Sequence, residues 1–326
     1  MALCEREWEC SHCAAFAAGE PYVMYCLETC LTNKSRYLLI KTIIFTGFTL
    51  IAFAANSVLC RLALGEKTID ASSFTVIRLL SGAIVLLVIL LINSNKNSSP
   101  IKGSWPASFM LFLYAVTFSF AYITLDTGTG AIILFGSVQI TMILLSLISG
   151  NRLHITEWIG VSIAFIGFVY LVSPGVTSPS VIGFSFMTIA GIAWGIYTLK
   201  GRDSVNPLMD TTYNFLRTIP FVIVLAIIAV QNTHYSSEGI LLAAVSGGIT
   251  SGIGYTIWYI ALGGLSNTQA AVVQLLVPVI AALGGVIFLS EKITLRLTFS
   301  AIMILGGILM VVRGRYYFVH LKLNRN

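Results

Sequence analysis

The sequence predicts an all-α membrane protein with ten transmembrane helices, arranged as two inverted five-helix repeats. The first observation is composition: hydrophobic residues make up 57% of the chain, charged residues only 10%, and the mean hydropathy is +0.90. A soluble domain has about a quarter of its residues charged. The second observation is a series of ten apolar stretches, and the third is a match between the first five and the last five.

Each apolar stretch has the length or the position of a membrane span. A helix needs roughly 20 apolar residues to cross a bilayer. Eight stretches meet this need, and they cover residues 37–60, 74–92, 107–125, 130–149, 181–199, 213–230, 240–262 and 270–290. The other two, residues 158–172 and 297–312, are shorter, and each is the fifth of its half. None alternates apolar and polar residues as a barrel strand does, so we expect helices.

The two halves match at a constant offset along the chain. Arg61 and Arg78 of the first half fall on Lys200 and Arg217 of the second. Because each copy has an odd number of spans, the second copy enters the bilayer from the opposite side, as in many secondary transporters.

These matches define the domain organisation. Residues 37–172 form the first five-helix repeat and residues 181–312 the second. Residues 313–326 are expected to form a basic cytoplasmic tail.

The first 36 residues have a different composition. Residues 1–36 are Cys-rich, and we expect a disordered extension or a spurious one. The spacing of Cys10, Cys13, Cys26 and Cys30 is compatible with a tetrahedral zinc site. Thiols on the cytoplasmic side stay reduced, however, and clustered cysteines need no ligand there. The preferred interpretation is therefore no metal.

Basic residues predict the orientation. If the N-terminus is cytoplasmic, most loop Lys and Arg residues fall on the cytoplasmic side and few on the outer side. This is the usual bias of multi-pass membrane proteins, so we expect the inner (plasma) membrane with both termini in the cytoplasm. The net charge of +6 suits anionic lipid. The basic residues are dispersed and no stacking platform accompanies them, so nucleic acid is not an expected partner.

Polar side chains within the spans indicate a candidate substrate-binding site. Asn56, Gln139 and Gln274 lie in the first, fourth and ninth spans, and Pro278 matches Gln139 in the repeat. Amides are costly in hydrocarbon, so they face the bundle or a wet cavity. Pro278 removes the hydrogen bond to the carbonyl of Gln274 and leaves that acceptor free. The alternative role is a hydrogen bond between helices.

Two aromatic residues and two arginines complete the candidate site. Trp194 and Tyr255 lie deeper in their spans than the other polar aromatics, and we expect them to contact substrate. Arg78 and Arg217 lie about one turn inside their spans. Each either reaches the headgroups as an anchor or acts as a gate or a partner for a substrate carboxylate.

The middle of every predicted span lacks Asp, Glu and His. Proton-driven pumps commonly carry such residues, so a protonmotive cation antiporter is disfavoured. The sequence also lacks an intramembrane Ser-His or paired-Asp arrangement and a Gly-rich phosphate loop. We therefore expect no enzyme, no catalytic residue, no cofactor and no metal.

Two segments carry a family resemblance. Residues 120–141 (FAYITLDTGTGAIILFGSVQIT) and 258–291 (WYIALGGLSNTQAAVVQLLVPVIAALGGVIFLSE), with the arginines early in the second span of each half, resemble the EamA-type transporters of the drug/metabolite transporter superfamily. The resemblance covers about residues 37–312. It implies export of amino acids and other small metabolites through a cavity lined by the third, fourth, eighth and ninth helices, with help from the first and sixth.

One motif of this family is present in only one half. Ser290-Glu291-Lys292 fits the family's corner after the fourth helix of a half, whereas Asn151 stands where the first half would carry the matching glutamate. A role that needs two symmetric carboxylates is therefore not expected.

The sequence thus predicts an integral inner-membrane transporter that exports small neutral or zwitterionic metabolites, amino acids in the first place, by alternating access. The expected partners are a small-molecule substrate and membrane lipid. The alternatives are a non-transporting membrane sensor or assembly protein, and a transporter of another small-metabolite class. A polar centre favours transport, whereas a dry and fully packed centre favours the non-transporting protein.

Overall fold

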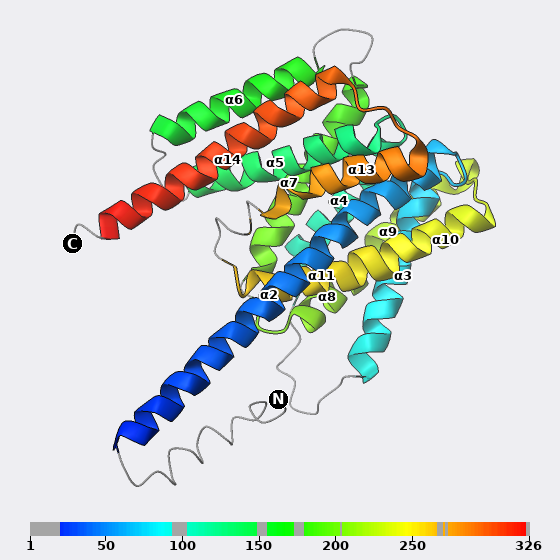
Figure 1. The fold of residues 1–326 in the computed structure, drawn as a ribbon. Coiled ribbons are helices and arrows are strands. Elements are labelled where there is room, and N and C mark those ends of the chain that lie inside the picture. Colours follow the sequence, from blue (N-terminus) through cyan, green and yellow to red (C-terminus); the bar gives the residue numbers. More distant parts are fainter. Residues whose placement is uncertain are drawn as a thin grey trace.

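The protein is a bundle of helices in the computed structural model (Figure 1). The structure describes residues 20–92, 103–148, 155–172, 179–202, 204–265, 270 and 273–323. Within these ranges the chain forms helices and no strand, apart from an isolated bridge between Ile69 and Tyr235. The predicted all-helical class is therefore confirmed.

The helices follow one another with short connections. In chain order they are α2 (Glu20–Gly65), α3 (Ala71–Ile92), α4 (Trp105–Tyr122), α5 (Thr127–Ile148), α6 (Ile155–Val172), α7 (Val181–Gly201), α8 (Pro207–Leu216), α9 (Ile219–Ala229), η1 (Val230–Asn232), α10 (Ser237–Val245), η2 (Ser246–Ile253), α11 (Gly254–Leu262), α13 (Val277–Leu289) and α14 (Leu295–Leu323).

Seven helical segments in the described ranges are long and apolar enough to cross a membrane. They are Leu38–Gly65, Ala71–Ile92, Trp105–Tyr122, Thr127–Leu145, Val181–Gly201, Pro207–Ala229 and Ser237–Leu262. Three shorter apolar helices are Trp158–Leu171, Val277–Leu289 and Leu295–Val311. Each of the ten predicted stretches thus coincides with an apolar helical segment, while ten crossings in two inverted repeats stay a prediction.

Two spans depart from a regular α-helix. The seventh is divided into α8 and α9 just before Pro220, which lacks the N–H that would continue the hydrogen-bond ladder. In the eighth span, the π-helix η2 connects α10 to α11, so that the three segments form one continuous helix. A π-helical turn re-aims the side chains that follow it, and such turns are frequent at functional sites.

Helix extends beyond the predicted repeats at both ends of the described chain. Helix α2 begins at Glu20, so residues 20–36 are helical and not unstructured. Cys10 and Cys13 of the suggested zinc site lie outside the described residues, and the described part contains no cluster of three or more potential metal ligands. Helix α14 continues to Leu323, so most of the basic tail is helical.

The helices pack into a central core and a peripheral pair. Helices α6 and α14 lie side by side along one face of the bundle (Figure 1). In the core, α4 and α5 pack on α7, α2 packs on α11 and α13, and α3 packs on η2 and α8. Glycine permits the approach of α3 and η2, because a Cβ at Gly247 would overlap the carbonyl oxygen of Arg78. Two further glycine pairs also lie close to neighbouring helices, Gly248 and Gly252 in η2 and Gly191 and Gly195 in α7.

Candidate functional site

A small closed cavity lies at the centre of the bundle. Its walls come from α2, α4, α5, α7 and α11, and the lining residues are Phe53, Asn56, Tyr114, Phe118, Leu134, Phe135, Trp194 and Tyr255. The free space is about 10 Å³, which is room for about one water molecule. The cavity therefore has to widen before it can hold a metabolite. Of the helices expected to line it, the ninth, α13, contributes none of the described lining residues.

Arg78 lies immediately behind the wall of this cavity. Its side chain is 1% exposed, so it is not a headgroup anchor. Nε donates to Ser251 Oγ (3.0 Å), and Nη2 donates to the hydroxyls of Tyr114 (3.2 Å) and Tyr255 (2.8 Å). The guanidinium also lies over the rings of Tyr114 and Phe118, at 5.2 and 4.9 Å from their centroids. A fixed positive charge thus stands beside the cavity.

Asn56 joins the cavity to the π-helix. Its Oδ1 accepts from Ser246 Oγ (2.7 Å) and Thr250 Oγ1 (3.1 Å), and its Nδ2 donates to the hydroxyl of Tyr114 (3.3 Å). The wider turn of η2 directs these hydroxyls, with that of Ser251, toward α2 and α3. Asn56 therefore combines a helix-helix hydrogen bond with a place on the cavity wall.

Aromatic rings form most of the remaining wall. The ring of Trp194 lies 4.5 Å from that of Tyr255 and 5.0 Å from that of Tyr114. Phe53 meets Trp194 edge to face at 5.4 Å. The indole N–H of Trp194 is buried and has no hydrogen-bond partner in the structure. Trp194 and Tyr255, which were expected to contact substrate, both line this cavity, and their contact with substrate stays a prediction.

The other predicted site residues lie elsewhere. Gln139 and Gln274 are buried but do not line the cavity. Gln274 donates from Nε2 to the carbonyl of Ala270 (3.1 Å), and its buried Oε1 has no partner among the described residues. Pro278 is buried near the start of α13. Arg217 directly follows α8 and is half-buried, with its guanidinium 6.0 Å from the ring centre of Trp105, so it does not share the fully buried setting of Arg78.

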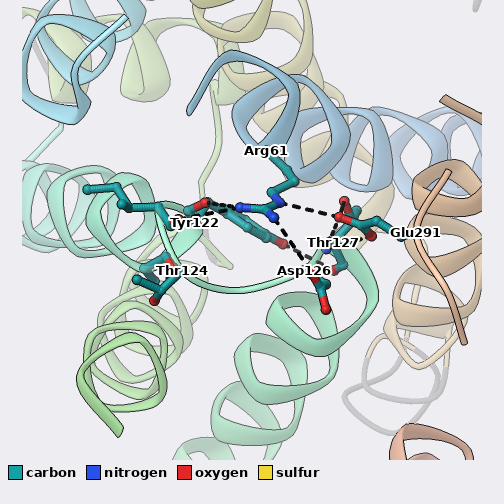
Figure 2. Close-up of polar contacts among 8 residues, drawn as sticks. Arg61, Tyr122, Thr124, Asp126, Thr127 and Glu291 are labelled. Carbon is teal, nitrogen blue, oxygen red and sulfur yellow. Dashed lines mark hydrogen bonds and ion pairs between the residues drawn. The ribbon is translucent and has the colours of Figure 1, made fainter. Parts of the chain in front are cut away.

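A cluster of charged and polar groups surrounds Arg61 (Figure 2). Arg61 Nε lies 3.3 Å from Glu291 Oε1, Nη2 lies 3.5 Å from Asp126 Oδ1, and Nη1 donates to the carbonyl of Tyr122 (3.0 Å). Glu291 also accepts from the backbone N–H of Thr127 (2.9 Å) and thereby caps α5. The cluster ties together the ends of α2, α4, α5 and α13.

The corner that positions Glu291 has an unusual backbone. Ser290 has φ = 54°, in the left-handed region that glycine adopts most easily. Its conformation turns the chain out of α13, and the N–H of Glu291 donates back to the carbonyl of Gly285 (3.1 Å). The carboxylate then points to the start of α5 (Figure 2).

Sequence reasoning missed several members of this centre. Tyr114 contacts Arg78, Asn56 and Tyr255, yet it lies in a span with no other distinctive residue. Phe53 and Phe118 are ordinary apolar residues in the sequence. The only local signal for η2 is its run of Gly, Ser and Thr, which also suits simple close packing.

Comparison with known proteins agrees with this architecture. Residues 181–313 match the EamA-like transporter family. An uncharacterized protein of Pseudomonas aeruginosa is 42% identical over 275 residues, which are 84% of this chain and 96% of that protein. An uncharacterized transporter of Archaeoglobus fulgidus is 24% identical, with 85% and 99% covered.

Two further similarities concern a named pump and a fold. A protein of Escherichia coli K12 named "Probable amino-acid metabolite efflux pump" is 24% identical, with 63% of this chain and 77% of that protein covered. A crystal structure superimposes with a TM-score of 0.57 at 17% identity, covering 81% of this chain and 98% of the other. This last similarity shows the fold alone. This multi-pass membrane protein is a transporter that belongs to the EamA-like transporter family.

Proposed function

We propose that the protein exports small neutral or zwitterionic metabolites, amino acids in the first place, across the inner (plasma) membrane. The observation that carries the proposal is the central cavity, where Asn56, Tyr255 and Trp194 from three helices face one enclosed space. Ligand sites typically combine apolar walls with a few placed polar groups. The name of the Escherichia coli relative supports amino acids as the cargo.

Transport proceeds by alternating access between two inverted five-helix halves. In such a repeat the first span corresponds to the sixth and the third to the eighth. The packing of α4 on α7 then has its counterpart in the packing of α2 on α11. The fifth span, α6, corresponds to the tenth, α14, so the contact between these two helices is its own counterpart. This pattern of contacts supports the repeat.

The conformation described here is occluded. The cavity holds about one water molecule, and the Arg61 cluster closes the end of the bundle where α2 finishes. With a cytoplasmic N-terminus, that end faces outward. Release of cargo to the outside then requires Arg61 to separate from Glu291.

The predicted residues have separate roles in this cycle. Asn56, Trp194 and Tyr255 contact the cargo in the widened cavity. Gln139, Gln274 and Pro278 enter that cavity as α5 and α13 move apart. Arg217 belongs to the opposite end from Arg61 and acts at the gate there.

Flux through purified protein in liposomes tests the function. Neutral and zwitterionic amino acids should exchange across the membrane, and quaternary ammonium dyes should not, because no described carboxylate faces the cavity to balance a cation. Dye transport as fast as that of any amino acid would contradict the proposed cargo. Absence of flux for every amino acid would favour the non-transporting alternative.

Reporter fusions test the orientation. A fusion after Arg202 should report cytoplasm, and one after Gly65 should report the outer side. A cytoplasmic signal at both positions would exclude the inverted arrangement.

A further inference from the structure

We propose that the central site selects the carboxylate of its cargo through Arg78, Tyr114 and Tyr255, and that it needs no ammonium group. The substrates are then small carboxylates with an apolar group, whether or not they carry an amine. This inference rests on the proposed transport function, and it extends the cargo from zwitterionic amino acids to carboxylates without an amine, which are anions.

The first argument is the missing counter-charge of Arg78. Among the described residues, its side-chain partners are the neutral hydroxyls of Ser251, Tyr114 and Tyr255. Its Nη1 is buried with no hydrogen-bond partner. In the part of the chain that the structure describes, carboxylates form ion pairs with Arg61 and none pairs with Arg78. A buried charge without a partner is strongly unfavourable, so the site is complementary to an anion.

The second argument is the direction of the hydroxyl protons. Tyr114 Oη is within hydrogen-bond distance of Arg78 Nη2, Asn56 Nδ2 and Tyr255 Oη. Asn56 Oδ1 accepts from η2, which fixes Nδ2 as the donor of this amide. Asn56 Nδ2 and Arg78 Nη2 can therefore only donate to the tyrosine hydroxyls. Only one of the two tyrosine hydroxyls can donate to the other, so the remaining hydroxyl proton has no acceptor among the described residues. Both tyrosines line the cavity, so that proton is available to a bound acceptor.

The third argument is the composition of the wall. Trp194 adds a buried indole N–H that lacks a partner. The rest of the lining is Phe53, Phe118, Leu134 and Phe135, all apolar. The site therefore offers several donors and an apolar surface. A carboxylate presents two acceptor oxygens, and its apolar group suits these rings better than a hydrated inorganic anion does.

The site has no matching partner for an ammonium group. None of the described lining residues is Asp or Glu, and the amide oxygen of Asn56 already accepts from Ser246 and Thr250. An amine therefore gains no charge-assisted bond there, and its removal should change affinity little. Arg78 itself does not line the closed cavity, so it acts first as a positioning residue that holds the two hydroxyls.

Matched ligands separate these contributions. Binding to the purified protein is measured by thermal shift and titration calorimetry with leucine, 4-methylpentanoate and leucinamide, and with phenylalanine, 3-phenylpropanoate and phenylalaninamide. In at least one series the amino acid and its deaminated analogue should bind with similar affinity. The amide should bind about tenfold more weakly or worse, which is the loss expected for one charge-assisted hydrogen bond.

Several results would overturn the inference. Equal binding of the amide and the carboxylate would do so, as would loss of binding when the amine is removed. Competition by sodium chloride as strong as that by a carboxylate, or no binding in either series, would also overturn it. Equal competition by chloride would identify a site for small inorganic anions instead.

Variants link the preference to the named residues. Tyr114→Phe keeps the ring and should lower affinity for the carboxylates about tenfold while leaving the weak binding of the amide unchanged. Arg78→Gln should abolish the preference for carboxylate over amide, a ratio that a purely structural role would not alter. The matched control is Tyr259→Phe, because Tyr259 is a buried tyrosine of the same helix as Tyr255 whose hydroxyl donates to the carbonyl of Tyr197 (3.2 Å).

The two proposals can fail separately. Binding of carboxylates without flux of any amino acid would refute the transport of amino acids and leave the carboxylate site in place. Flux of amino acids that the amides inhibit equally well would refute the carboxylate site and leave the transport function in place.

Discussion

Arg61 and Glu291 form an ion pair of 3.3 Å between the end of α2 and the corner after α13. Both side chains are largely buried, at 20% and 13% exposure, whereas the second partner of Arg61, Asp126, is 60% exposed. Glu291 also accepts from both the N–H and the hydroxyl of Thr127. The two carboxylates therefore contribute unequally to closure of this end (Figure 2).

The first prediction concerns opening at this end. Glu291→Gln keeps the shape but loses the charge, and it should weaken closure by about 1.5–3 kcal/mol, as expected for hydrogen bonds to a charged group. Cys60, fully buried next to Arg61, can report the opening. With the cysteines before residue 31 replaced by serine, a membrane-impermeant maleimide should label Cys60 faster in Glu291→Gln than in the parent.

Two variants serve as controls for this prediction. Asp126→Asn should change the labelling rate little, because an exposed ion pair contributes about 0–1 kcal/mol. Glu66→Gln removes an exposed carboxylate outside the cluster and should have no effect. If Asp126→Asn matched Glu291→Gln, exposure would not determine the strength of these pairs, and the assignment of Glu291 as the main closing residue would be wrong.

The second prediction concerns the contact between α3 and η2. A Cβ at Gly247 would overlap the carbonyl oxygen of Arg78 and the hydroxyl of Ser81. Gly247→Ala should therefore destabilise the protein by about 1–3 kcal/mol, the usual cost of overpacking. Gly306→Ala is the matched control, since a Cβ there meets nothing within 4 Å. It should be neutral or stabilising by up to about 1 kcal/mol, because alanine favours a helix over glycine.

Thermal unfolding in detergent measures both glycine variants. A Gly247→Ala protein with the parent's melting temperature would show that α3 and η2 can separate at no cost.

Sequence patterns predicted the helices far better than the centre. Length and hydropathy placed the sixth span at residues 181–199, and the helix covers Val181–Gly201. These properties are local, so a single sequence carries them. The environment of Arg78 is not local: Tyr114 and Tyr255 are 36 and 177 residues away along the chain. Depth along a helix left both roles of Arg78 open, the headgroup anchor and the gate or carboxylate partner, because the partners that permit burial belong to other helices.

The repeat was a useful guide to position and a poor guide to environment. It paired Arg78 with Arg217, yet the first is buried against two tyrosines and the second lies near Trp105. Gln139 and Gln274 were expected on the cavity wall because they are polar. Both are buried in the bundle without lining the closed cavity.

The third prediction concerns pH and the loop that precedes α3. Asp70 caps α3 through the N–H of Ser73 (2.9 Å) and accepts the N–H of His234 (2.9 Å) from the loop before α10. Burial alone would raise the pKa of Asp70, but the hydrogen bonds from Ser73 and His234 outweigh it and lower the pKa below its ordinary value of 3.8. The ionised form therefore stabilises the fold.

The sign of the pH effect follows from this shift. A lowered pKa in the folded state contributes stability above the ordinary value, and that contribution is lost as pH falls through the folded-state pKa. Asp70→Asn, which cannot titrate, should melt below the parent at neutral pH, and the difference should shrink as pH falls below about 4. A difference in melting temperature that stays constant across this range would contradict the assigned role.

The fourth prediction concerns Gln274. Its Oε1 is buried without a partner, while Nε2 bonds the carbonyl of Ala270 one turn earlier. Gln274→Leu removes an unsatisfied acceptor and introduces a side chain that a membrane bundle tolerates, so the melting temperature should stay level or rise. Flux should nevertheless fall, because in the widened cavity the amide is proposed to bind cargo. Gln274→Glu keeps the acceptor and adds a charge, and it should repel a carboxylate and lower flux further. If Gln274→Leu were stable with unchanged flux, Gln274 would have no role in the transport cycle. Its buried Oε1 would then be only a consequence of helix packing.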